Sequence, residues 1–394
     1  MRAWATIAIL GVTVRLALAA VSLGTNDAAT FVRFAETIHE KGLLETYRTD
    51  PELNHPPIPA YWASIARQLG GDSDLLFAFT FKLPIIATDA ASVWLIWRIW
   101  RRRTTAARAA AIAAGYAWSL DSILVSGFHC NTDPIYAMLC LAAIYLIEES
   151  SAWFWAGLAL GAAINIKIIP VLLIVPLVLS MRNWRSLWLF VAGLAPGALP
   201  FLPLLYRIGP SFVRNALLYN SWMDHWGINY YLLLGQGDFN LHSATAPIAI
   251  FYYRYARYLI VALILGWAAL ARAYNRWSRY ELAAVTFAIF LILTPGFGVQ
   301  YTIMIGPLLF AIRPKLAIAY AWLAGVFLFC TYFVFWDGYF PIYANYHTLL
   351  SAPVAAIGIL VWALVVAFLI TELLKARHQR GMGVHDSAYK SGQT

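Results

Sequence analysis

A short polar segment, FHCNTDP at residues 128–134, separates two apolar runs and carries three side chains that could take part in chemistry. His129, Asn131 and Asp133 can donate or accept hydrogen bonds, and two of them can carry a proton. Three interpretations are open: a solvated turn in which Asn131 or Asp133 caps the next helix, a metal site, or one wall of a substrate site. The metal site is the weakest, because His129-Cys130 has no second pair of ligands at zinc-binding spacing.

A second candidate is Asp27, which directly follows the first apolar run. We expect Asn26 to cap a helix whose apolar residues recur at helical spacing and which can lie in the membrane interface. Asp27 is then either a carboxylate favoured by the helix N-terminus or a general base at the mouth of a cavity. The apolar residues in question are Phe31, Phe34, Ala35 and Ile38.

The composition indicates which elements must position these side chains. Of the 394 residues, 61% are hydrophobic and only 12% are charged, and the mean hydropathy is +0.67. Soluble chains are about a quarter charged, so the sequence predicts an all-α membrane protein with little room for a soluble domain. Three cysteines without ligand spacing predict neither a disulfide framework nor a metal site.

Apolar runs predict about twelve transmembrane helices within residues 1–374, followed by a disordered cytoplasmic tail at 375–394. Arg15 interrupts the first run, which favours a retained helix over a cleaved signal peptide. The twelve expected spans are 4–23, 75–98, 109–126, 134–148, 152–165, 168–180, 187–206, 249–271, 281–295, 302–312, 316–336 and 351–374.

The positions of the basic residues predict how the chain is oriented in the membrane. With both termini in the cytoplasm, the dense basic segments 98–108, 182–185, 272–279, 313–315 and 375–380 all fall inside, as the positive-inside rule requires. The net charge of +9 is explained in this way, so we expect no nucleic-acid partner. The polar segments then emerge on the external face: 24–74, 127–133, 165–167, 207–248, 296–301 and 337–350.

Three expected spans are shorter than the roughly 20 residues that cross a bilayer. Short helices leave a recess on one side, and irregular backbone at that depth is acceptable where it lines such a cavity. Asn165, Lys167, Gln300 and Tyr301 stand at the ends of these short runs. We therefore expect an external cavity, with a long amphipathic first loop and several short helices around it.

Six motifs follow one another along the chain: Asp27 after the first span, Gly42…Tyr47…His55-Pro56-Pro57, Lys82-Leu83-Pro84 with Asp89, NTDP at 131–134, NIKIIP at 165–170 and GFGVQY at 296–301. In the order and shared side of these motifs, most of the chain resembles the GT-C glycosyltransferases, above all the polyprenyl-phosphate-mannose-dependent mannosyltransferases. The resemblance implies an inverting enzyme that moves a hexose, with mannose favoured, from a polyprenyl-phosphate carrier to a lipid-linked glycan or glycolipid. It also implies that Asp27 is the catalytic base.

Further site residues follow from the chemistry that this donor requires. Its phosphate needs basic groups, for which Lys167, Arg254, Arg257 and, deeper, Arg15 are candidates. Asp89 is an intramembrane acid and therefore a functional candidate, although helix packing also explains it. For Arg254 and Arg257, the alternative is that their side chains snorkel to lipid headgroups. The residues expected to shape the pocket are His55, His129, Asn131, Asp133, Gln300 and Tyr301, with Asp133 the second-choice acid; the segment 220–240 adds aromatic and amide groups.

No cofactor is expected, and a divalent metal is left open because Asp72-Ser73-Asp74 matches a DxD pattern that helix capping also explains. Two other functions compete. Twelve spans with broken helices also describe secondary transporters, but those usually show internal repeats, and 24–74 and 207–248 differ in composition. A non-catalytic lipid-handling protein is the second alternative. The interpretation kept is a multi-pass cell-membrane enzyme whose active site, donor, acceptor and surrounding lipids meet on the external face.

Overall fold

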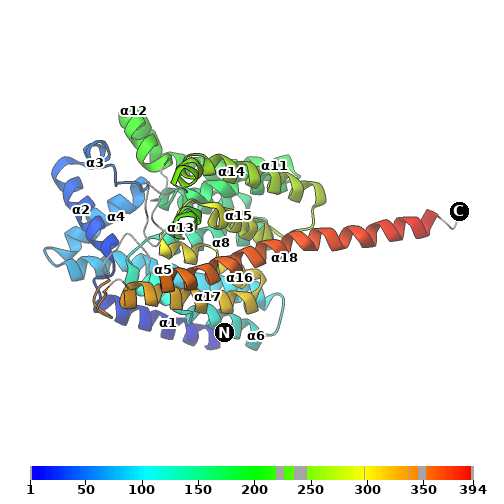
Figure 1. Cartoon of the computed structure of the whole chain (residues 1–394), viewed down its shortest axis with the longest axis horizontal. Coiled ribbons are helices and arrows are strands. Elements are labelled where there is room, and N and C mark those ends of the chain that lie inside the picture. The colour runs from blue at the N-terminus through cyan, green and yellow to red at the C-terminus, as the bar shows by residue number, and fades with distance from the viewer. Residues whose placement is uncertain are drawn as a thin grey trace.

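The computed structural model describes residues 2–218, 226–234, 246–296, 298–335, 337–344 and 352–391. Within these ranges the regular secondary structure is helical, and the strand-like contacts are two isolated bridges, Gly24 with Tyr343 and Tyr339 with Tyr343. The all-α architecture predicted from composition is therefore confirmed. Figure 1 shows the helices packed side by side, with the N-terminal helices α2 to α4 at one end and α18 projecting from the other.

The first five helices are α1 (Arg2–Ala20), α2 (Asn26–Lys41), α3 (Leu43–Thr49), α4 (Pro57–Gly70) and α5 (Asp74–Arg101). Thr25, not Asn26, is the N-cap of α2, and its side chain accepts a hydrogen bond from the backbone N–H of Asp27. The apolar face of α2 packs against protein, since Phe31 is buried with its ring centroid 4.5 Å from that of Phe81 in α5. Phe31, Phe34 and Ala35 are therefore covered by protein, and the position of this helix in the membrane interface stays a prediction.

The middle of the chain contains helices that are broken or short. The expected span 109–126 is broken into two helical pieces. The first is α6 (Ala106–Ala117), and the second is formed by α7 (Leu120–Ile123) and η1 (Leu124–His129) in continuation; the angle between the two pieces is 49°. The π-helical turn η1 ends at His129, within the polar segment 128–134. The next elements are α8 (Asp133–Ser150), α9 (Trp153–Ile166), the 3₁₀ turn η2 (Ile169–Leu173) and α10 (Ile174–Ser180).

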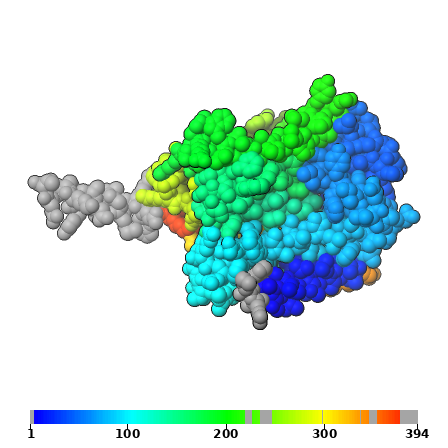
Figure 2. Space-filling model, turned by 180° about the vertical axis from the view of Figure 1, so that it is seen from behind, coloured from blue at the N-terminus to red at the C-terminus, as the bar shows by residue number. Residues whose placement is uncertain are grey.

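A second bend, of 62°, separates α11 (Trp184–Leu194) with η3 (Ala195–Ala198) from α12 (Phe201–Phe212) with η4 (Val213–Leu217). In Figure 2 this green segment covers one face of the molecule and meets the blue N-terminal helices at its end. The remaining elements are α13 (Ile228–Leu234), α14 (Ala246–Tyr274), α15 (Arg279–Leu293), η5 (Val299–Met304), α16 (Gly306–Ile312), α17 (Pro314–Cys330), η6 (Thr331–Phe335) and α18 (Ala352–Ser391).

Each of the twelve apolar runs coincides with helix in the structure, but not all of them are long enough to be counted as spans. Four helices in the described part are long and apolar enough to cross a membrane, or six if each bent pair is one span. Four shorter apolar helices accompany them: Ala5–Ala20, Trp153–Ile166, Ile169–Ser180 and Val299–Ile312. The chain is thus a multi-pass membrane protein. The count of twelve spans stays a prediction, as does the division at residue 375, which lies within α18.

The basic junctions gather at one end of the helix bundle. Four of the five contact a neighbouring helix end through an arginine or lysine, and the fifth, 182–185, directly follows the Met181 carbonyl that Arg272 binds. The ends of α5, α8, α10, α14, α16 and α18 therefore share one region. This convergence is what a positive-inside arrangement requires. The contacts are Arg102–Glu149 at 2.8 Å, Arg272 to the Met181 carbonyl at 3.0 Å, Arg279–Glu148 at 3.0 Å, Arg313–Glu372 at 2.8 Å and Lys375–Glu281 at 2.9 Å.

Candidate active site

Asp27, on the first turn of α2, is bound through one of its two carboxylate oxygens. His129 Nε2 lies 3.0 Å from Asp27 Oδ2, and Asn131 Nδ2 donates to the same oxygen at 2.6 Å. No donor to Oδ1 occurs among the described residues, and the side chain is 27% exposed. The structure therefore holds one oxygen in place and leaves the other accessible to a ligand.

The backbone between His129 and Asn131 explains why both side chains reach one oxygen. Cys130 has φ 69°, in the left-handed region that non-glycine residues rarely adopt, so the chain reverses direction between them. Thr25 Oγ1 donates to the His129 carbonyl at 3.0 Å and joins the start of α2 to this turn. Gly24, at φ 101°, makes the approach possible, since a Cβ there would lie 2.6 Å from the Phe128 carbonyl oxygen.

The other ring nitrogen of His129 faces a residue that the sequence analysis missed. Tyr332 Oη, from η6, lies 2.5 Å from His129 Nδ1. The two ring nitrogens of His129 thus contact Asp27 on one side and the tyrosine hydroxyl on the other, so the three groups form a hydrogen-bonded chain. Nothing in the surrounding TYFVF run could have identified Tyr332, which is buried within an apolar helix.

The hydrogen bonds strongly favour the charged form of Asp27. Burial acts to raise the pKa of this carboxyl group, but the hydrogen bond and charge of His129, the amide of Asn131 and the charge of His55 outweigh it. Together they lower the pKa of Asp27 to about 2. The carboxylate is therefore ionised at every physiological pH, as a group that must receive a proton has to be.

Lys167 and Asp133 form an ion pair close to this carboxylate. Lys167 Nζ lies 2.5 Å from Asp133 Oδ1 and 4.2 Å from the ring centroid of Tyr301. Asp133 Oδ2 and the hydroxyl of Tyr136 are buried without a hydrogen-bond partner, and Tyr136 was not predicted from the sequence. Asn131 Oδ1 also accepts from the first backbone N–H of α8, that of Asp133, at 3.2 Å, while the N-cap residue is Thr132.

His55 completes this group from the loop between α3 and α4. Its ring centroid lies 5.1 Å from that of Phe31, and its carbonyl accepts the Tyr47 hydroxyl at 2.6 Å. Burial, followed by the positive charge of Lys167, lowers the pKa of His55 to about 3, against the opposing effect of Asp27. His55 is therefore neutral near pH 7. We call Asp27, His55, His129, Asn131, Asp133, Lys167, Tyr301 and Tyr332 the Asp27 cluster.

Arg15 and Asp89, both predicted to bind substrate, bind each other instead. Arg15 Nε lies 2.8 Å from Asp89 Oδ2, and both side chains are 2% exposed. The same oxygen accepts from Ser122 and Ser126, and Tyr116 donates to Oδ1 at 2.8 Å. This arrangement is the helix-packing alternative, in which a buried charge pair is satisfied within the protein. It also anchors η1, one turn before His129.

Three further predicted residues lie outside the Asp27 cluster. Arg254 is exposed on α14, and Arg257 donates to the Leu218 carbonyl at 3.5 Å beside a separate pocket. Gln300 folds back over Gly298.

Most of the segment 220–240 lies outside the described residues. At the DxD pattern, Ser73 caps α5 and Asp74 pairs with Arg67, and within the described ranges no group of three or more metal-ligating side chains forms.

Two comparisons with known proteins indicate the family of the chain. Residues 55–299 match the model of glycosyltransferase family 87. Over 191 residues, the chain is 28% identical to the undecaprenyl phosphate-alpha-4-amino-4-deoxy-L-arabinose arabinosyl transferase of Edwardsiella ictaluri (strain 93-146). That match covers 43% of this chain and 33% of the relative, so the chain spans about a third of the relative's length. Because the family match covers more than half of the chain, the protein belongs to glycosyltransferase family 87.

Proposed function

We propose that the protein transfers a hexose, with mannose favoured, from a polyprenyl-phosphate carrier to a hydroxyl of a lipid-linked glycan or glycolipid, with inversion at the anomeric carbon. The family match supports glycosyl transfer, and the name of the arabinosyl transferase relative supports a polyprenyl-phosphate donor. In this proposal the chain crosses the cell membrane about twelve times, both termini are cytoplasmic and the Asp27 cluster faces outward.

The observation that carries the proposal is the asymmetric binding of Asp27. His129 and Asn131 hold Oδ2, while Oδ1 is accessible to an acceptor hydroxyl. Oδ1 takes the hydroxyl proton as the acceptor oxygen bonds to the anomeric carbon. The bond from that carbon to the phosphate oxygen breaks on the opposite face, and polyprenyl phosphate leaves with the electron pair. A single base and no covalent intermediate are needed.

The low pKa of Asp27 constrains the timing of the proton transfer. A carboxylate of pKa about 2 is a weak base towards a neutral hydroxyl. We therefore expect the proton to move late, once the acceptor oxygen has partly bonded to the sugar and its proton has become acidic. Lys167 is the cation of the cluster that can stabilise the departing phosphate, by sharing its ammonium between Asp133 and the phosphate oxygens.

The test uses purified protein with labelled polyprenyl-phosphate mannose, and then with other lipid-phosphate sugars and with nucleotide sugars. Asp27→Asn keeps the shape of the side chain and removes its basicity, so we expect transfer to fall by about 10²-fold to 10⁴-fold, while the melting temperature stays close to that of the wild type. Glu40→Gln, on the exposed side of the same helix, is the matched control. Full activity of Asp27→Asn removes this base from the mechanism. Activity with nucleotide sugars alone overturns the donor class.

A further inference from the structure

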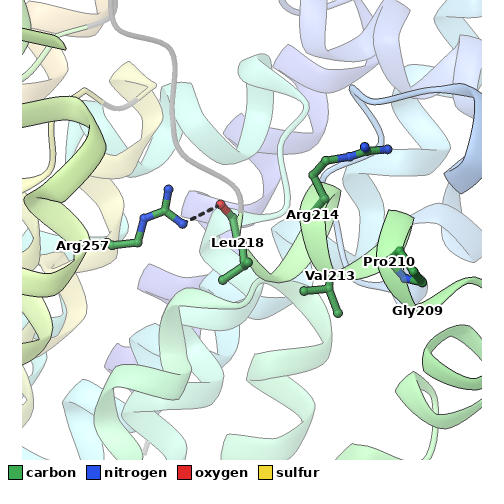
Figure 3. A pocket seen from close by; sticks show the side chains of 6 residues that line it. All are labelled: Gly209, Pro210, Val213, Arg214, Leu218 and Arg257. Atoms are coloured by element: carbon green, nitrogen blue, oxygen red, sulfur yellow. Dashed lines mark hydrogen bonds between the residues drawn. The ribbon is translucent and has the colours of Figure 1, made fainter. Parts of the chain in front are cut away.

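A pocket of about 530 Å³ lies on the α12 and α14 side of the molecule. Its lining is formed by the kink of α12, the start of η4 and the side chain of Arg257 from α14. In Figure 3 the Arg257 guanidinium points across from α14 towards Leu218, whereas the Arg214 guanidinium points away from Arg257 and Leu218. We call this feature the Arg257 pocket; its lining residues are Gly209, Pro210, Val213, Arg214, Leu218 and Arg257.

The guanidinium of Arg257 is poorly satisfied. Within the described ranges its Nε is buried without a hydrogen-bond partner, and the one bond that the guanidinium makes, to the Leu218 carbonyl, is 3.5 Å long. Among the described residues no carboxylate pairs with it. Arg15 is a useful contrast, because its guanidinium donates to Asp89, Ser122 and two carbonyl oxygens. A partly buried guanidinium with unused donors is costly unless an anion binds it.

The surroundings indicate where such an anion comes from. Arg257 belongs to α14, one of the four helices long and apolar enough to cross a membrane. Apolar side chains on the outer faces of both helices are uncovered, among them Leu205 of α12 and Tyr258 and Leu259 of α14. In a bilayer these faces contact acyl or prenyl chains, so a ligand that enters from them is a lipid. Phosphate is the anionic group that membrane lipids carry and that arginine binds in a bidentate manner.

We infer that the Arg257 pocket binds the phosphate of a membrane lipid, held chiefly by Arg257 and further attracted by Arg214, while the lipid chain lies along α12 and α14. The site is separate from the Asp27 cluster and does not rest on the chemistry proposed there. Two sources supply this phosphate: a bilayer phospholipid and the polyprenyl phosphate carrier.

Two glycines allow a steric test with a matched control. A Cβ at Gly209, which lines the pocket, meets nothing within 4 Å, so a large side chain there projects into open space. Gly266 of α14 also meets nothing within 4 Å but does not line the pocket. Gly209→Trp therefore obstructs the pocket, and Gly266→Trp places the same side chain elsewhere on the membrane-facing helices. Arg257→Gln removes the charge without adding bulk.

The experiment measures binding of phosphatidylglycerol, undecaprenyl phosphate and diacylglycerol to the full chain in neutral detergent, by native mass spectrometry and by the shift in melting temperature. All variants carry Asp27→Asn, so turnover does not contribute. We expect the affinity for at least one phosphate lipid to fall about tenfold or more in Arg257→Gln and Gly209→Trp, and to be retained in Gly266→Trp. Diacylglycerol should bind weakly to all of them.

Preference for phosphatidylglycerol assigns the pocket to bilayer lipid, and preference for undecaprenyl phosphate assigns it to the carrier. Phosphate-lipid binding that is equal in the Asp27→Asn parent and in its Arg257→Gln and Gly209→Trp derivatives overturns the proposal, as does equal binding of diacylglycerol. The melting temperature without lipid verifies that each variant is folded. Loss of transfer activity in Asp27→Asn, with binding intact, separates this proposal from the proposed function.

Discussion

His129 Nε2 lies 3.0 Å from Asp27 Oδ2, although the two residues are 102 positions apart in the sequence. The histidine thereby joins the first turn of α2 to the end of the broken helix that begins at Ala106. Its other ring nitrogen contacts Tyr332, so three separate segments meet at one imidazole.

Removing His129 should move the acidic limb of the activity profile to higher pH. The hydrogen bond and charge of His129 help to lower the pKa of Asp27 to about 2, so a His129→Ala variant has a higher Asp27 pKa and loses its base sooner on acidification. We expect an upward shift of about one pH unit in the acidic limb of kcat/KM, measured from pH 2 to pH 6 because the limb of the wild type is set by a pKa of about 2. Glu40→Gln should leave the limb in place, and an unmoved limb in His129→Ala contradicts the assignment.

Tyr332→Phe should lower kcat more than it raises KM. Without the hydroxyl, His129 Nδ1 loses the partner that fixes its tautomer, so Nε2–H is no longer directed reliably at Asp27. We expect a decrease in kcat of about tenfold, since one positioning hydrogen bond is lost. Tyr252→Phe is the control, because its hydroxyl bonds the Leu293 carbonyl, away from His129. Equal effects of the two substitutions would argue for a merely structural role.

Gly24→Ala should damage both stability and activity. A Cβ at Gly24 adds a contact of 2.6 Å with the Phe128 carbonyl oxygen to the strain of φ 101°. Gly42→Ala separates these two effects, because Gly42 has φ 80° but open space around it. We expect Gly42→Ala to cost about 1 kcal/mol and Gly24→Ala clearly more, with transfer reduced only in the latter. Equal losses of melting temperature would show that the close approach is unimportant.

Removing one member of the Arg15–Asp89 pair should destabilise the protein more than removing both. Arg15→Met leaves a buried carboxylate and Asp89→Asn leaves a buried guanidinium, and either single change should cost about 3 kcal/mol or more. The double variant should be more stable than the sum of the single changes predicts. Thermal unfolding in detergent measures the three variants. Additive losses would mean that the two side chains act independently.

Acidification should destabilise the folded protein through His55. Its pKa is lowered from 6.5 to about 3, so between these values the unfolded chain binds more protons than the folded one, and stability falls as the pH falls. His55→Gln should flatten the dependence of melting temperature on pH between 4 and 6.5. His39→Gln, on the exposed end of α2, is the matched control. An unchanged slope in His55→Gln contradicts the effect.

Most of the helical architecture could be predicted, because the signal is local. Apolar runs form helices in a membrane since the backbone groups must be satisfied within the segment, and each of the twelve predicted runs coincides with helix. Broken helices were less predictable. The bend between α6 and α7 and the π-helical turn η1 arise where Arg15, Ser122 and Ser126 gather around Asp89, and such contacts leave no periodic pattern.

The candidate site was predicted only in part. Asp27, His129 and Asn131 stood out because polar residues beside apolar runs are conspicuous, and the structure brings them together. Tyr332 and Tyr136 did not, because a tyrosine inside an apolar run resembles ordinary packing. Arg254 and Arg257 were placed with Lys167 by charge alone, whereas the structure puts Arg257 at another pocket. Charge reveals which residues can bind phosphate, but not which of them share a site.

The sequence by itself determined the membrane class, the helical content and the set of polar residues available for chemistry, since these depend on composition and on neighbours along the chain. Only the tertiary structure decided that His129 and Asn131 bind one oxygen of Asp27 and leave the other accessible. That choice depends on the left-handed backbone of Cys130, on the close approach of Gly24 and on a hydroxyl 203 residues from His129. These are relationships between distant segments, and packing alone sets them.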